Sequence, residues 1–144
     1  MREEANFDLT NYNSYRIISH SERVYFPSSE NDFIYIFYKD SSQKKIVLGG
    51  GYNIILSKNF YKETFVIVSD SFARINLEKE SIISCEAGAT TKELAEYALQ
   101  SNLTGAEIFY DIPSSIGGAV VMNAGASGEE IKDILIKVRY LDLA

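Results

Sequence analysis

The clearest pattern of apolar and polar positions lies between residues 90 and 102. Four apolar side chains there recur at the three- and four-residue spacing that gathers side chains on one helix face: Leu94, Ala95, Ala98 and Leu99. Thr90 and Glu93 stand at the spacing of a capping box, in which the first turn of a helix is closed by reciprocal hydrogen bonds. We therefore predict a helix over residues 91–101 that ends at Asn102.

Elsewhere the pattern is mostly one of short apolar runs. Runs of β-branched and aromatic residues predict strands or extended segments at 23–26, 46–48, 54–56, 65–68 and 134–143, with 46–48 buried. Residues 72–77 and 81–86 flank a polar turn at 78–80, which is typical of a hairpin. A second helix is predicted to begin at residues 28–30 and to run through about Tyr38, with an apolar face formed by Phe33, Ile34, Ile36 and Phe37. The mixture indicates an α+β or α/β class, and the 144 residues are enough for one domain.

Charge and the scarce residue types exclude several functions. Fourteen Lys and Arg against twenty Asp and Glu give a net charge of −6, which argues against a broad basic face for nucleic acid or anionic membrane. The lone Cys85 and lone His20 exclude an intramolecular disulfide, a multi-cysteine zinc site and a His-rich metal site. We expect His20 to be satisfied or solvent-facing rather than catalytic. The acidic start and the absence of long apolar runs predict a soluble, cytoplasmic protein.

The glycines are concentrated in two segments, the first of which is LGGGYNIIL at 48–56. Consecutive glycine N–H groups can form a concave nest for an anion without any lysine, and a tight hairpin is an equally good interpretation of the tripeptide alone. Two familiar phosphate motifs are absent. The dinucleotide fingerprint would need glycine where Ile54 stands, and the Walker A loop would need a Gly-Lys pair, which the chain lacks.

The second segment, residues 104–128, combines small residues and turn formers with little charge. Small side chains let a flat, extended ligand lie directly on the backbone, and Asn123 offers both a donor and an acceptor. A tightly packed loop followed by a small-residue helix is the alternative interpretation. We favour binding, because packing alone seldom needs so many small residues in one loop.

Together the two segments resemble the UDP-N-acetylenolpyruvoylglucosamine reductases, also called UDP-N-acetylmuramate dehydrogenases. LGGGYNIIL is similar to that family's Leu-Gly-x-Gly-Ser-Asn-x-Leu loop, and IPSSIGGAVVMNAGASGEEI at 112–131 is similar to its Ile-Pro-Gly-[Ser/Thr]-Val-Gly-Gly-Ala run. Asn13-Ser14-Tyr15-Arg16-Ile17 stands where the family has Asn-Thr-x-Arg-Ile, and Glu86-Ala87-Gly88-Ala89 matches its Ala-Gly-Ala. The likeness runs from about residue 9 to the end, with departures from the family pattern that include Tyr52, Ser114 and Ser127.

This resemblance implies an α+β FAD-binding domain of the vanillyl-alcohol-oxidase (PCMH) type over residues 1–144. Two small α+β subdomains, about 1–70 and about 71–144, would clasp an extended FAD. The first glycine segment would cradle the pyrophosphate, and the second would line the flavin and ribityl chain. The implied cofactor-binding residues are Gly49, Gly50, Gly51, Tyr52, Asn53, Ile54, Pro113, Ser114, Ser115, Gly117, Gly118, Asn123, Ala124 and Gly125.

The same resemblance implies a role in peptidoglycan synthesis, where FAD carries hydride from NADPH to the enolpyruvyl group of a UDP-sugar. The catalytic Ser, Arg and Glu of the family have no counterparts here, so we expect the FAD-binding portion without the substrate-binding domain and without catalytic or metal-binding residues. NADPH and the UDP-sugar would bind only with that missing domain, and we expect a monomer. The alternative is a stand-alone flavin- or nucleotide-binding module, or a ligand-free interaction domain, of the same fold.

Overall fold

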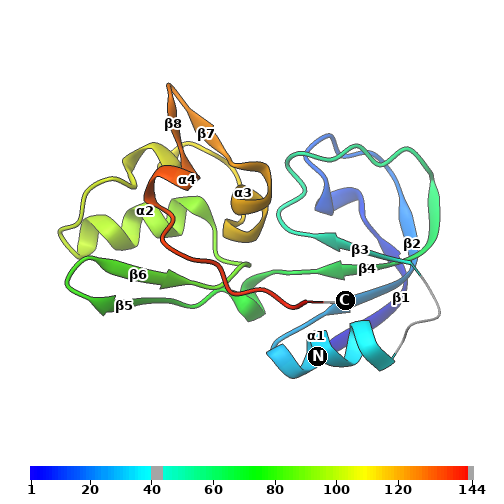
Figure 1. The fold of residues 1–144 in the computed structure, drawn as a ribbon. Coiled ribbons are helices and arrows are strands. Elements are labelled where there is room, and N and C mark those ends of the chain that lie inside the picture. The colour runs from blue at the N-terminus through cyan, green and yellow to red at the C-terminus, as the bar shows by residue number, and fades with distance from the viewer. Residues whose placement is uncertain (40–43, 143–144) are drawn as a thin grey trace. The chain divides into compact units, whose positions relative to one another are not determined.

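The computed structural model describes residues 1–39 and 44–142, which form strands and helices in two compact units (Figure 1). The first unit comprises Met1–Ser71 together with the residues from Tyr140 on, and the second comprises Phe72–Arg139. Each unit contains both helices and strands, so the α+β class is confirmed. Among the described residues, no helix has the length and apolar character that a membrane crossing requires.

The first unit is built on a four-stranded sheet in the order β1-β2-β4-β3. Its strands are β1 (Arg2–Asp8), β2 (His20–Phe26), β3 (Lys45–Leu48) and β4 (Phe60–Ile67). β1 runs antiparallel to β2, whereas β2, β4 and β3 are mutually parallel. A 3₁₀ turn at Thr10–Tyr12 follows β1, and α1 (Glu30–Ile34) continues into a π-helical turn at Tyr35–Lys39. A further 3₁₀ turn, Asp70–Phe72, follows β4.

Side-chain alternation along the strands divides the apolar residues of the first unit between two faces of the sheet. The larger cluster comprises Leu9, Val24, Phe26, Leu48, Leu56, Tyr61, Phe65 and Ile67. On the other face Tyr25 and Val66 pack with Ile36 of the π-helical turn.

Residues 54–56, predicted to be extended, form no strand, and only Leu56 of the three is buried. Two expectations for this unit were wrong in detail. Val47, expected to be buried, is exposed because β3 is an edge strand. Ile34 is also exposed, because it lies at the margin of the helical stripe that Phe33, Ile36 and Phe37 form.

In the second unit the hairpin of β5 (Ile75–Lys79) and β6 (Ile82–Cys85) is followed by α2 (Thr91–Gln100). The Thr90–Glu93 capping box is present, and Asn102 ends the helix in the left-handed region at φ 55°, with Leu103 N–H donating to the Ala98 carbonyl. The buried stripe of α2 is Thr91, Leu94, Ala95 and Ala98. Leu99, expected in that stripe, is 75% exposed, because it lies about 80° around the helix from Thr91.

The rest of the second unit consists of short elements. They are a 3₁₀ turn at Glu107–Tyr110, α3 (Ile116–Met122), β7 (Gly125–Ala126), β8 (Glu129–Glu130) and α4 (Ile131–Ile134). Phe109, Ile116, Ala119 and Ile131 pack with α2 into one core.

The predicted strand at 134–143 is wrong within the described residues. Ile134 ends α4, and residues 135–142 are neither helix nor strand, with Ile136 72% exposed. Alternating apolar residues make a strand only where another strand supplies hydrogen bonds, and no described strand pairs with this segment. Leu143 of the predicted strand lies outside the described residues.

Candidate functional site

The three parallel strands of the first unit end at one edge of its sheet. Pro27 follows β2, Gly49 follows β3 and Val68 follows β4, so these connections all leave from the carboxyl edge. Open sheets with parallel strands characteristically bind ligands outside this edge. A hollow of about 690 Å³ opens there, lined by Met1, Arg2, Tyr12, Phe26, Ser28, Ser69, Asp70 and Ser71.

The first glycine segment leaves β3 at this edge and is held by residues 12–14. Gly51 is buried with φ +70°, and an added Cβ would lie 2.1 Å from the Tyr12 carbonyl oxygen. Ser14 N–H donates to the Gly51 carbonyl at 3.1 Å, and Ser14 Oγ donates to the Tyr52 carbonyl at 3.4 Å. Glycine is therefore required at position 51 both for its left-handed backbone and for the close approach of another chain segment.

These contacts use the carbonyl groups of the loop and leave its N–H groups available. Within the described part of the chain, no hydrogen bond is made by the N–H groups of Gly50, Gly51, Tyr52 and Asn53. Gly50, Tyr52 and Asn53 are exposed. A row of unpaired, uncharged N–H donors beside glycine is the donor set that a phosphate oxyanion requires, so this loop fits the pyrophosphate of FAD.

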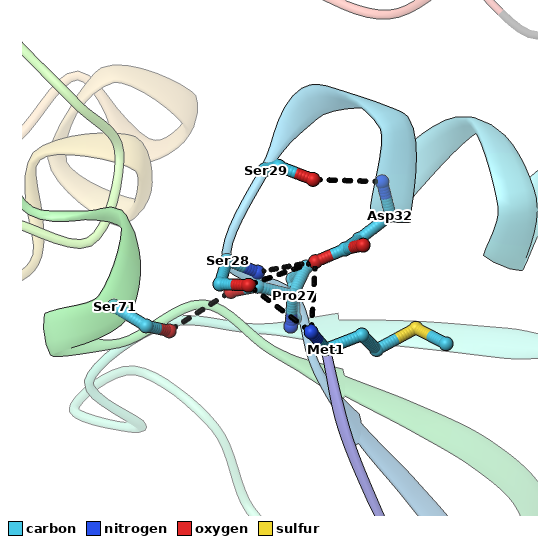
Figure 2. A network of polar contacts seen from close by, with 6 residues as sticks. All are labelled: Met1, Pro27, Ser28, Ser29, Asp32 and Ser71. Atoms are coloured by element: carbon cyan, nitrogen blue, oxygen red, sulfur yellow. Dashed lines mark hydrogen bonds and ion pairs between the residues drawn. The ribbon is translucent and has the colours of Figure 1, made fainter.

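A polar network ties the carboxyl edge together beside the hollow (Figure 2). Ser28 donates to Asp32 Oδ2 through its N–H at 2.8 Å and through Oγ at 3.0 Å, and the Met1 amino group lies 3.3 Å from the same oxygen. Ser71 Oγ donates to the Pro27 carbonyl at 2.9 Å. The Ser28 N–H, helped by the serine hydroxyl and the Met1 amine, lowers the pKa of Asp32 to about 2. Asp32 is therefore a charged structural anchor rather than an acid or base.

A second hollow, of about 500 Å³, lies at the opposite edge, where β3 and β4 begin. It is lined by Lys44, Lys58, Phe60, Lys62 and Glu63. Lys58 already pairs with Glu63 at 3.0 Å. Since the glycine loop leaves from the other edge, we place the candidate cofactor site at the carboxyl edge.

The second glycine segment lies in the second unit and surrounds α3. Ser115 caps this helix by accepting from Gly118 N–H at 3.3 Å, and Ile116 and Gly117 donate to the carbonyls of Ala89 and Ala87 at 2.7 and 2.9 Å. A Cβ on Gly117 would lie 2.9 Å from the Ala87 side chain. Gly117 is therefore needed for packing against residues 87–89.

The end of α3 has a similar explanation in packing. Asn123 takes the left-handed region at φ 48°, and a Cβ on Gly125 would lie 2.2 Å from the Glu129 carbonyl oxygen. Ser127 and Gly128, with φ values of 55° and 92°, form the turn between β7 and β8, as in a type I′ hairpin. Ser114, which replaces a glycine of the family pattern, is not in the left-handed region, so its Cβ causes no backbone strain there.

The segments 113–118 and 123–125 are thus joined by α3, whose seven residues span about 10 Å. The packing interpretation accounts for Gly117 and Gly125, while Pro113 is exposed at one end of the helix and Gly125 at the other.

Thr91 is a structural residue of this segment that sequence reasoning missed. It is buried, its N–H donates to the Ser114 carbonyl at 3.0 Å, and its hydroxyl donates to the carbonyls of Ile112 and Ser114. Its sequence signal was a polar residue at the start of the helix, in phase with the apolar stripe of Leu94, Ala95 and Ala98. The Thr91 side chain therefore links residues 112–114, on either side of Pro113, to the start of α2 by hydrogen bonds.

Known proteins are similar to this chain in sequence and in fold. A reductase from Francisella tularensis, UDP-N-acetylenolpyruvoylglucosamine reductase, is 40% identical over 136 residues, which are 94% of this chain and 47% of that protein. The protein of the same name from Orientia tsutsugamushi strain Ikeda is 37% identical over 141 residues, covering 95% of this chain and 46% of its own length. The chain thus spans about half the length of these curated relatives.

A solved structure has the same fold. The crystal structure of UDP-N-acetylenolpyruvylglucosamine reductase from Thermus caldophilus superposes with a TM-score of 0.73 at 22% identity, covering 92% of this chain and 45% of that one. The family described as "FAD binding domain" matches residues 21–144, which include both glycine segments. The cofactor of this family is FAD, and the chain belongs to it.

Proposed function

We propose that residues 49–54 hold the pyrophosphate of FAD through backbone N–H groups. The observation that carries this proposal is the asymmetry of the loop: Ser14 binds the carbonyls of Gly51 and Tyr52, while the N–H groups of Gly50 to Asn53 have no partner among the described residues. Membership of the FAD-binding family supports it. In a chain of net charge −6, uncharged donors replace the lysine or arginine that other phosphate sites use.

Pro113, Ser114, Ser115, Gly117, Gly118, Asn123, Ala124 and Gly125 would line the flavin and the ribityl chain, as the resemblance implies. The small side chains of Ser114, Gly118 and Ala124 support this assignment, because they let a flat ring approach the backbone. Thr91 and Ala87 would then hold these residues in place, since Thr91 donates hydrogen bonds to the Ser114 carbonyl and Ala87 accepts one from the Gly117 N–H.

The chain would act as the FAD-binding portion of a UDP-N-acetylenolpyruvoylglucosamine reductase in the bacterial cytoplasm. The names of its relatives support this activity. When bound, FAD would supply hydride transfer, with NADPH as reductant and an enolpyruvyl UDP-sugar as acceptor. The residues of this chain would contribute binding and orientation of the cofactor.

Titration with FAD tests the proposed site. The purified chain should bind FAD with a change in flavin fluorescence, and Gly50→Val should weaken binding at least tenfold, because the side chain would cover the N–H groups. Gly50 is exposed and outside the left-handed region, so the variant is expected to fold. Unchanged affinity in Gly50→Val would mean that the loop is only a turn.

A charge-matched pair of variants sharpens the test. Gly50→Asp places a carboxylate among the proposed phosphate donors, whereas Asn59→Asp adds the same charge at an exposed position before β4. Only the first should weaken FAD binding, and an equal loss in both would indicate a general charge effect.

Complementation tests the reductase activity separately. A chimera in which this chain replaces the matching portion of the Francisella tularensis reductase should restore growth to a bacterium lacking this reductase, because the rest of that protein supplies the residues that this chain is expected to lack. Failure to do so, with FAD binding intact, would favour a flavin-binding module without catalysis.

A further inference from the structure

Asn13 is a buried polar side chain, only 2% exposed, between β1 and β2. Its Nδ2 donates to the carbonyls of Leu9, Thr10 and Ile17 at 3.1, 3.3 and 3.1 Å, and its Oδ1 accepts from Ile17 N–H at 2.9 Å. All four partners are backbone groups. One amide side chain therefore supplies the hydrogen bonds that a strand or helix would otherwise give to residues 9–17.

These bonds close residues 9–17 into a compact turn. Tyr12 N–H donates to the Leu9 carbonyl at 2.9 Å, and Arg16 N–H donates to the Asn13 carbonyl at 3.1 Å. Arg16 occupies the left-handed region at φ 54°, which an arginine rarely adopts without support from its surroundings. The Asn13 bonds to Leu9 and Ile17 clamp both ends of the turn around this residue.

The turn is also what holds the glycine loop. Ser14, in this turn, donates its N–H to the Gly51 carbonyl. Tyr12, in the same turn, has the carbonyl against which Gly51 packs. Residues 50–53 belong to no strand, and their own local structure is only a turn at Tyr52 and Asn53. Their conformation therefore depends on where Tyr12 and Ser14 are held.

We propose that Asn13 is a positioning residue for the pyrophosphate-binding loop, acting through the backbone of Tyr12 and Ser14 on Gly51 and Tyr52. This inference rests on the proposed function of residues 49–54. The role requires both ends of an amide: Asp keeps the acceptor for Ile17 N–H and loses the three donations, and Ala loses all four bonds. Without the clamp the loop samples several conformations, and binding FAD must order it again.

The test compares Asn13→Ala and Asn13→Asp with Ser21→Ala. Ser21 is fully buried in β2, and its hydroxyl also donates to backbone carbonyls, those of Arg23 and Glu63 at 2.8 and 3.1 Å. Ser21→Ala thus loses buried hydrogen bonds at the opposite edge of the sheet. The dissociation constant of FAD is measured well below the melting temperature of each variant, so that every sample is folded.

Both Asn13 variants should raise the dissociation constant of FAD at least tenfold and shift the ³¹P resonances of bound FAD. Ser21→Ala should lower the melting temperature but leave the dissociation constant and the ³¹P resonances unchanged. Equal affinity in all folded variants would overturn the inference. If either variant fails to fold, Asn13→Ser, which keeps one hydroxyl and places no charge in this buried site, decides the question by the same two measurements.

Failure of the proposed function gives a different result. If the wild-type chain binds no FAD, or if Gly50→Val binds as tightly as the wild type, the loop is not a pyrophosphate site and the role of Asn13 falls with it. If Gly50→Val loses FAD while the Asn13 variants do not, the loop site stands and only the positioning role is wrong.

Discussion

The backbone N–H of Ser28 donates to Oδ2 of Asp32 at 2.8 Å, one turn into the helix that follows β2. Ser28 Oγ and the Met1 amine reach the same oxygen, so three donors converge on one carboxylate (Figure 2). The arrangement joins the beginning of β1 to the end of β2 at the carboxyl edge. The carboxylate is stabilised in its charged form, which lowers the pKa of Asp32 to about 2.

Asp32 should therefore make stability depend on pH in the acid range. In an unfolded chain an aspartate titrates near 3.9, so its contribution to folding is fully present above about pH 4 and is lost as the pH falls through about 2. Asp32→Asn should lower the free energy of unfolding by about 1 kcal/mol at pH 7. Urea denaturation between pH 2 and 6 should show this difference shrinking toward pH 2, and a pH-independent difference would contradict the assignment.

Gly51→Ala should be among the most destabilising small substitutions in the first unit. The new Cβ would lie 2.1 Å from the Tyr12 carbonyl oxygen, and the residue would have to keep φ +70°. Because both effects act together, we expect a loss of about 3 kcal/mol in chemical denaturation.

Gly128→Ala is the matched control, since this glycine also has positive φ, at +92°, but no heavy atom within 4 Å of the added Cβ. It should cost about 1 kcal/mol, from the backbone alone. Similar losses in the two variants would mean that the contact with Tyr12 contributes nothing.

The parts of the fold that the sequence predicted are those fixed by local interactions. The helix of Thr91–Gln100 begins at its own capping box and ends before Asn102, so neighbouring residues determine both of its limits. The segment at 134–143 has an equally regular alternation, but a strand needs hydrogen bonds from a neighbour, and alternation says nothing about whether one exists.

For the candidate site, glycine clustering was informative about position and ambiguous about cause. Gly51 has a positive φ and also has no room for a Cβ, because the carbonyl of Tyr12, thirty-nine positions earlier, lies against it, and no local pattern reveals that contact. Gly117 is small because Ala87 lies against it, a contact that also joins distant positions. Asn13 and Thr91 were not predicted to be structural residues, because their partners are backbone carbonyls, whose directions only the folded chain defines.

Cys85 should be unreactive in the folded chain. Burial in the β5–β6 hairpin raises the pKa of its thiol to about 11. At pH 8 only about a thousandth of the thiol is ionised at that pKa, against about a quarter for a free cysteine. A thiol reagent such as DTNB should therefore modify Cys85 at least a hundredfold faster in 6 M guanidinium chloride than in buffer. Rapid reaction of the native chain would show that β6 opens or that the thiol is exposed.

Thr91→Val should loosen the Pro113 loop while keeping the shape of the side chain. The substitution removes the hydroxyl that donates to the Ile112 and Ser114 carbonyls and leaves the Ile112 carbonyl without this donor, which should lower stability by about 1–2 kcal/mol. Thr104→Val, at an exposed position, should change stability by less than about 0.5 kcal/mol. Because the Thr91 N–H still donates to Ser114, the variant should remain folded, with faster hydrogen exchange confined to the residues around Pro113.

If the residues around Pro113 line the flavin, FAD affinity should fall in Thr91→Val and stay constant in Thr104→Val. A stability loss with unchanged affinity would place the flavin elsewhere.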